Sequence, residues 1–161
     1  MAIRQPLVLG ADGLPQQLQA GDSISSAISA VTVRQVTNSD AAAIVIGAPV
    51  YAFGPDQVKK AQANAKATAQ VTGLGYDVTI AAAGTGNVIS EGILVATTAQ
   101  WDAVAGTTGG LTFGTRYFLD PATAGKITAT PPSTGGQVNT LIGIALSTTE
   151  LNLTIGVPML L

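Results

Sequence analysis

The amino-acid sequence predicts an all-β protein, a compact antiparallel β-sandwich or barrel of short strands with an extended N-terminal arm. Short runs rich in β-branched residues follow one another at a spacing of roughly 8–12 residues, separated by breaks rich in Gly, Pro, Asn and Thr, which is typical of a sandwich or barrel. The 161 residues are 47% hydrophobic, which is enough to build the core of one domain of ordinary size.

The first 24 residues predict an arm rather than a long strand or helix. Residues that favour turns interrupt this segment repeatedly, namely Pro6, Gly10, Gly13, Pro15 and Gly21. Its apolar residues nevertheless make it more hydrophobic than a disordered tail: Leu7, Val8, Leu9, Leu14, Leu18 and Ile24. We therefore divide the chain into an arm, residues 1–24, and a β-domain, residues 25–161. The arm either becomes ordered on a partner or packs on its own domain.

The β-domain is predicted to begin with a strand over residues 28–36, where apolar and polar residues alternate in part. Residues 38–40 are predicted to form a turn. The next apolar stretch, residues 42–50, is interrupted by a glycine and a proline, and residues 51–55 close it.

Residues 59–70 carry conflicting signals. Their high alanine content favours a helix, but Ala61, Ala63, Ala65, Ala67 and Ala69 recur at a strict period of two. In a strand this period places every alanine on one face and the polar residues on the other, whereas a helix would leave no apolar stripe. We therefore predict a strand, and its shallow alanine face suits close approach of another layer or subunit.

The rest of the chain predicts one short helix among strands. Residues 97–104 are predicted to form one or two helical turns, with Thr97 or Thr98 as the N-cap. Further strands are predicted over residues 78–81, 87–90, 92–97, 115–119, 126–130, 137–146 and 150–155. The glycines of Gly73-Leu-Gly75 and Gly84-Thr-Gly86 are interpreted as turn residues, because the pattern lacks the third glycine and the helix of a dinucleotide site.

Composition excludes several classes of function. Charged residues make up only 10% of the chain, and the net charge is −2. So little charge indicates either a surface covered by partners or a surface made of Thr, Ser, Gln and Asn. Lys59, Lys60 and Lys66 form a basic cluster that is too small for the phosphate contacts of nucleic-acid binding. No apolar stretch reaches the roughly 18 residues of a membrane-spanning helix, and no signal peptide is recognisable.

Catalysis and cofactor binding find little support in the residue types present. The chain has no cysteine and no histidine, which removes thiol nucleophiles, the Ser-His-Asp triad and nearly every transition-metal site. The acidic residues are spread singly, and Asp56, Asp102 and Asp120 are predicted to be turn or cap residues. The single tryptophan, Trp101, is interpreted as a core anchor, with a sugar-stacking platform as the alternative. We therefore expect no enzymatic activity, no metal and no cofactor.

Several segments, taken in order, resemble a family of tailed-bacteriophage virion proteins, the head decoration (cement) proteins and head fibres. These segments are residues 5–22, 61–73, 92–104, 109–120, 125–132 and 142–147. The most specific part is a strand ending in Tyr117-x-Leu-Asp, then Gly125-Lys-Ile-Thr, a Pro-Pro turn and Ile142-Gly-Ile-Ala-Leu. The resemblance implies a compact β-domain, assembled as a homotrimer and attached to the capsid shell through extended N-terminal residues.

The function expected on this basis is that of a non-enzymatic structural protein that decorates and stabilises the outside of a phage capsid. Its partners would be the major capsid protein and further copies of itself, without nucleic acid or membrane. Its place would be the surface of the virion, after synthesis in the host bacterial cytoplasm. The alternative is a receptor- or glycan-binding fibre or tail-associated module, in which Trp101 and Tyr117 would form the platform.

Two sets of residues are expected to make the contacts of this structural protein. The residues expected to bind the capsid are Pro6, Leu7, Val8, Leu9, Leu14 and Leu18. The trimer contacts are expected at the alanine face and at the C-terminal strands, the alanines being Ala61, Ala63, Ala65, Ala67 and Ala69.

Overall fold

The computed structural model describes residues 7–9, 15–17 and 31–161 of the chain. Within the predicted arm, β1 (Leu7–Leu9) and β2 (Pro15–Gln17) pair as an antiparallel ladder. The other expected capsid-binding residues, Pro6, Leu14 and Leu18, lie outside the described residues. Residues 28–30, the start of the first predicted strand of the β-domain, also lie outside them.

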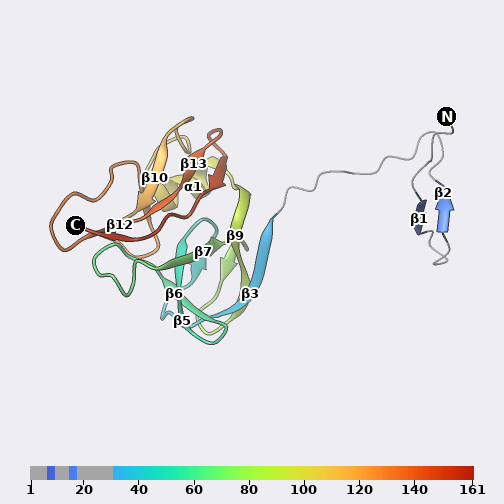
Figure 1. The fold of residues 1–161 in the computed structure, drawn as a ribbon, viewed down its shortest axis with the longest axis horizontal. Helices are drawn as coiled ribbons and strands as arrows, with labels where there is room; N and C mark the ends of the chain where they lie inside the picture. The colour runs from blue at the N-terminus through green and yellow to red at the C-terminus, as the bar shows by residue number, and fades with distance from the viewer. Residues whose placement is uncertain (1–6, 10–14, 18–30) are drawn as a thin grey trace.

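Five strands close into a barrel, which confirms the all-β fold class (Figure 1). They are β3 (Thr32–Asn38), β5 (Pro49–Gly54), β6 (Gln57–Lys60), β7 (Val71–Gly75) and β9 (Thr85–Val95). β3 pairs with β6 in parallel and with β9 in antiparallel orientation, and β5 joins β6 to β7. Because β7 also pairs with β9, the ring of strands is complete.

β9 extends beyond the barrel into a second sheet. Its last residues pair with β14 (Glu150–Leu153), which is followed by β13 (Leu141–Ala145), β10 (Arg116–Leu119) and β11 (Ile127–Thr128). Gly92 has a φ of +106° and lies beside a register shift between β9 and β3, so β9 bends where it passes from one sheet to the other. Two small ladders complete the fold: β4 (Ile44–Val45) with β8 (Thr79–Ile80), and β12 (Val138–Asn139) with β15 (Met159–Leu160).

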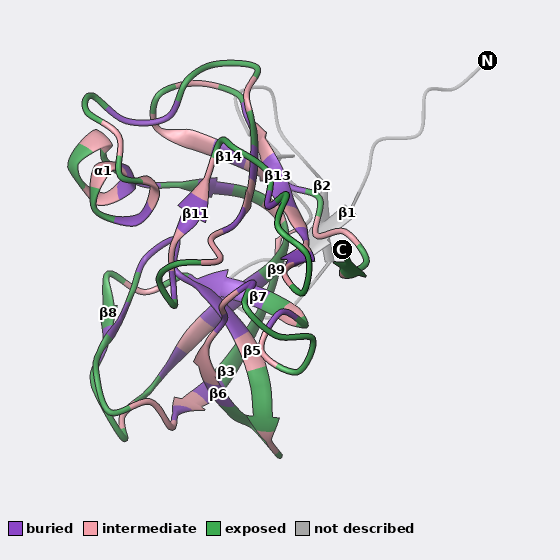
Figure 2. Ribbon diagram, turned by 90° about the vertical axis from the view of Figure 1, so that its left-hand side faces the viewer, coloured by how far each residue is buried: buried purple, intermediate pink, exposed green. Residues whose placement is uncertain are grey.

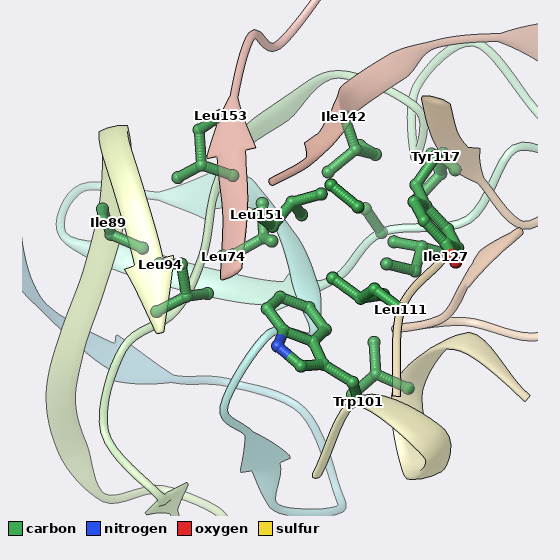
Figure 3. Close-up of a cluster of buried hydrophobic side chains, with 14 of the residues drawn as sticks. Leu74, Ile89, Leu94, Trp101, Leu111, Tyr117, Ile127, Ile142, Leu151 and Leu153 are labelled. Atoms are coloured by element: carbon green, nitrogen blue, oxygen red, sulfur yellow. The ribbon is translucent and has the colours of Figure 1, made fainter. Parts of the chain in front are cut away.

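The buried apolar residues form two clusters, and buried residues are drawn in purple in Figure 2. The smaller cluster fills the barrel with Val36, Ile44, Ala48, Val50, Val58, Ile80 and Val88. The larger cluster lies between the second sheet, helix α1 (Thr98–Ala105) and the outside of the barrel (Figure 3). It includes Leu74, Ile89, Leu94, Trp101, Leu111, Tyr117, Ile127, Ile142 and Leu151. Two cores of this kind explain how a chain with many short strands buries most of its large side chains.

Helix α1 matches the sequence prediction closely. Thr97 is its N-cap, and a capping box joins Thr97 to Gln100. Gly106 ends the helix in the left-handed conformation, with a φ of +64°. Trp101 is fully buried, and its indole N–H donates a 2.9 Å hydrogen bond to the carbonyl oxygen of Thr149. The interpretation of Trp101 as a core anchor is therefore confirmed.

Gly73, Gly75 and Gly86 are strand residues, so their interpretation as turn residues is wrong. A Cβ at Gly73 would lie 2.7 Å from the carbonyl oxygen of Ile89, and a Cβ at Gly86 would lie 2.5 Å from a side-chain carbon of Ile80. Glycine is needed because closing a small barrel brings backbone and side chains too near for any Cβ. The same glycines concealed β7 from a sequence pattern that relies on β-branched residues.

The predicted strand over residues 59–70 is also wrong beyond Lys60. β6 ends there, and residues 61–70 form turns in which the Thr68 hydroxyl donates a 2.9 Å hydrogen bond to the carbonyl oxygen of Gln62. Such local bonding by a threonine side chain competes with strand pairing. The alanines share no face: Ala61, Ala63 and Ala69 are buried in the core of the chain, whereas Ala65 and Ala67 are exposed.

Several strand boundaries differ from the prediction in smaller ways. The strands predicted over residues 87–90 and 92–97 form the single strand β9, because the kink at Gly92 bends the ladder without ending it. The stretch predicted over residues 137–146 contains both β12 and β13. Residues 51–55, predicted as a closing segment, lie mostly in β5.

Gly75→Ala tests the role of glycine in barrel closure. The new Cβ would lie 2.5 Å from the carbonyl oxygen of Val45, so the backbone must shift. We expect a loss of about 1–3 kcal/mol in the free energy of unfolding, the usual cost of overpacking, measured by chemical denaturation. Gly135→Ala is the matched control, since a Cβ there meets nothing within 4 Å. Equal stability of the two variants would contradict this role for Gly75.

Candidate functional site

Acidic side chains, the obvious candidates for chemistry, mostly support the backbone instead. Asp40 accepts a 3.1 Å hydrogen bond from the N–H of Lys60, and Asp77 accepts one of 2.8 Å from the N–H of Asn87. Asp120 accepts a 2.9 Å bond from the N–H of Thr123, three residues further along. The prediction that Asp120 is a turn residue is thereby confirmed. Each of these carboxylates stabilises a different turn or strand end, and none of their hydrogen bonds joins two of them.

Asp102 has the most perturbed environment of these groups. Its carboxylate accepts hydrogen bonds from the N–H of Gly110 at 2.8 Å, the hydroxyl of Thr107 at 2.9 Å and the N–H of Gly109 at 3.0 Å. The Gly110 N–H contributes most to lowering the pKa of Asp102; partial burial opposes the shift, and Thr107 and Gly109 reinforce it. Asp102 thus remains ionised and fixes the loop that follows helix α1, which is a structural role.

The aromatic residues suggested for glycan binding are not available to a ligand. Trp101 is 0% exposed and Tyr117 is 1% exposed. The Tyr117 hydroxyl accepts a 3.0 Å hydrogen bond from the N–H of Thr112. Because both rings are enclosed in the larger core cluster, they form no platform on which a sugar ring could stack.

The described residues offer no cluster of three or more acidic side chains that could hold a metal ion. Within the same residues, no helix is long and apolar enough to cross a membrane. The basic cluster is dispersed: Lys59 lies over the ring of Phe53, 3.7 Å from its centre, and Lys66 is exposed on a different loop. The electrostatic attraction between Lys59 and Phe53 is a cation–π contact on the surface.

The surface has hollows but no deep cleft among those observed. One hollow of about 290 Å³ lies between helix α1 and the β4–β8 ladder and is lined by Val45, Val78 and Ala99. Another, of about 280 Å³, lies against four barrel strands and is lined by apolar groups, hydroxyls and Arg34. Both are at or below the lower end of the size of small-molecule sites.

One face of the second sheet exposes large apolar side chains and is the most distinctive surface feature. Residues paired directly across antiparallel strands point to the same side of a sheet. Arg116 pairs with Ile144, Ile144 with Asn152, and Asn152 with Ile93, so these four form one row across the sheet. We call this side the outer face, and it consists of Ile93, Val95, Arg116, Phe118, Leu141, Ile144, Leu146, Glu150 and Asn152.

The apolar character of the outer face shows in the exposed fractions of its side chains. Val95 is 59% exposed, Leu146 is 39% exposed and Ile93 is 37% exposed. The opposite side of the same strands carries Leu94, Leu151 and Leu153, which are buried. The sheet therefore carries apolar side chains on both sides, although the residues that the structure describes cover only one of them.

The sequence contained a signal for the outer face. A strand with one solvated side alternates apolar and polar residues, whereas a strand that is covered on both sides is apolar throughout. Residues 93–96 and 141–146 are uninterrupted runs of apolar residues and glycine; the first contains the end of β9 and the second contains the whole of β13. The predicted site residues, in contrast, are spread over β1, the partly buried loop after β6 and residues outside the described ranges.

Asp102→Asn tests the electrostatic support of the loop after helix α1. Because the pKa of Asp102 is lowered by folding, its contribution to stability is fully present above the unfolded-chain pKa of about 3.9. This contribution is lost as the pH falls through the still lower folded pKa. We expect the variant to be less stable than the wild type at pH 7 and the difference to shrink at acidic pH, measured by denaturant titration across pH. A difference that is independent of pH would contradict this role.

Comparison with protein families, curated proteins and solved structures finds no significant match to the chain.

Proposed function

We propose that the chain is a non-enzymatic structural subunit of a tailed-bacteriophage particle, which decorates and stabilises the outside of the capsid. In this proposal the arm anchors the subunit to the major capsid protein, and the β-domain joins copies of the chain into a trimer. The observation that carries the proposal is the exposed apolar outer face. It lies on a domain in which Asp40, Asp77, Asp102 and Asp120 accept hydrogen bonds from the domain's own backbone and Trp101 and Tyr117 are buried in the core.

The first support is that the buried polar side chains of the β-domain are hydrogen-bonded within it. No buried side-chain nitrogen or oxygen among the described residues lacks a hydrogen-bond partner. The buried Asn38, for example, donates to the carbonyl oxygens of Ile80 and Ala42 and accepts from the N–H of Asp40. Catalytic and ligand-binding sites commonly leave such groups unpaired or strained, so this pattern favours a structural role.

The second support is the amount of large apolar side chain at the surface. Phe113 is 76% exposed and Val157 is 84% exposed, in addition to the residues of the outer face. Apolar surface that is gathered on one face marks a site of contact with other proteins. A chain with only 10% charged residues is suited to a densely packed assembly.

The third support is the composition of the arm. Burying a few hundred Å² of apolar surface contributes several kcal/mol at about 25 cal/mol per Å², before the cost of ordering the segment. Three arms on one trimer would bind together, and linked binding of this kind raises the overall affinity by about 10²–10⁴-fold. An arm with Leu7, Val8 and Leu9 in sequence provides the apolar side chains for such an anchor.

Deletion of residues 1–22 tests the anchoring role of the arm. The measurement is co-sedimentation with heads of the encoding virus that were purified without this protein. We expect binding to fall by at least about a hundredfold, as the loss of linked contacts implies, while the circular dichroism spectrum and the mass of the assembly stay unchanged. A second variant tests whether the apolar side chains of the arm are responsible. It is the full-length chain with Leu7, Val8, Leu9, Leu14 and Leu18 changed to serine, and it should lose binding equally. Undiminished binding of either variant would refute the anchoring role.

A further inference from the structure

The charged residues of the outer face are arranged so that two copies of the face complement each other. Arg116 lies on β10, which is one edge of the sheet at this level, because β11 pairs only with Phe118 and Leu119. Glu150 lies on β14 and pairs with Val95 of β9, which is the opposite edge. The face therefore carries a positive charge at one side and a negative charge towards the other, with apolar residues between them.

Arg116 and Glu150 are not direct neighbours on the sheet. Arg116 is next to Ile144 of β13, and β14 lies one strand further away, so two inter-strand spacings separate them, about 10 Å in total. Glu150 also lies two residues along β14 from Asn152, the residue in line with Arg116. Both side chains reach solvent.

We propose that the outer face is the contact between copies of this chain, with Arg116 of one copy against Glu150 of the next and the apolar residues of the face buried between them. The inference rests on the proposed function in that it names the partner of the β-domain as a second copy. Opposite charges at the two sides of one face favour a head-to-tail contact, in which the basic side of one copy meets the acidic side of the next.

The edges of the sheet support a second copy as the occupant. Among the described residues β9 has no partner on the β3 side beyond Glu91, so Ile93 and Val95 lie on a sheet edge that these residues leave unpaired. At Arg116, β10 also has a strand partner on one side alone within the part of the chain that the structure describes. Free strand edges next to exposed apolar side chains associate readily with other strands unless a partner covers them. In a closed ring, the basic edge of each copy would lie against the acidic side of the next copy. Every copy would then have both of its sheet edges covered.

The first test compares Val95→Asp with Val78→Asp in the full-length chain. Both valines are well exposed, at 59% and 67%, and the substitution is identical, but Val78 lies beside the β4–β8 ladder, outside the outer face. We expect Val95→Asp to raise the dissociation constant of the assembly at least about a hundredfold and Val78→Asp to leave it unchanged. The readout is the solution mass by light scattering over a dilution series, with circular dichroism to show that both variants are folded.

The second test exchanges the charges. Arg116→Glu alone and Glu150→Arg alone place like charges together and should each weaken the assembly about tenfold or more. The double variant restores opposite charges in every contact and should recover most of the wild-type mass. Recovery identifies the ion pair, because a general loss of stability would be greater in the double variant.

The outcomes separate this inference from the proposed function. A wild-type assembly that persists in Val95→Asp, or a monomeric wild type, overturns the outer face as the contact between copies. Binding of the full-length chain to virus heads is measured independently, and its absence would overturn the proposed function even if the outer face joins copies in solution. A species near three times the chain mass of 16.1 kDa would agree with both.

Discussion

Strand β9 is the element on which the rest of the structure depends, because among the described strands it belongs to both sheets. Its first part closes the barrel between β3 and β7, and its last part is the partner of β14. Side chains along it enter both cores, with Val88 in the barrel and Ile89 and Leu94 in the larger cluster. The kink at Gly92 lets one continuous strand serve both, so the two parts of the domain are joined by backbone hydrogen bonds as well as by packing.

Much of this fold could be predicted from local sequence, because the relevant interactions are local. The N-cap at Thr97 and the helix after it follow from residues within a few positions of one another. The short strands and the core position of Trp101 follow from composition and spacing. In each case the signal and the structure that it specifies occupy the same segment of chain.

The predictions that were wrong concern features that depend on distant parts of the chain. The period-two alanines indicate a strand only if a partner strand is available, and the loop after β6 instead places Ala61 and Ala63 against the core. Gly73 and Gly75 on their own indicate turns. They are needed in a strand because barrel closure brings the carbonyl oxygens of Ile89 and Val45 close to them, and local sequence does not reveal this approach. The outer face could not be assembled from sequence, since its row of Arg116, Ile144, Asn152 and Ile93 joins four strands through pairing registers that no local pattern encodes.

The two proposals divide the work of a structural subunit between separate parts of the chain. The arm would supply adhesion to the shell, and the outer face would supply cohesion between copies. Separation of this kind allows each contact to be weak alone, because several weak contacts made together hold a subunit firmly. A structural role of this kind agrees with the way the polar side chains of Asp102 and Tyr117 are used, since both accept hydrogen bonds from the backbone of loops.

The pairing of β3 has a consequence for how the chain is made. Val33 pairs with Ile89, more than fifty residues later, and the nearer partner β6 contacts only the end of β3. At a synthesis rate of about 5–20 residues per second, β3 leaves the ribosome roughly 3–10 seconds before its main partner. During that interval the nascent strand is unpaired, and its sequence suits the delay. Arg34 and Gln35 interrupt the apolar residues and discourage premature association with other nascent chains.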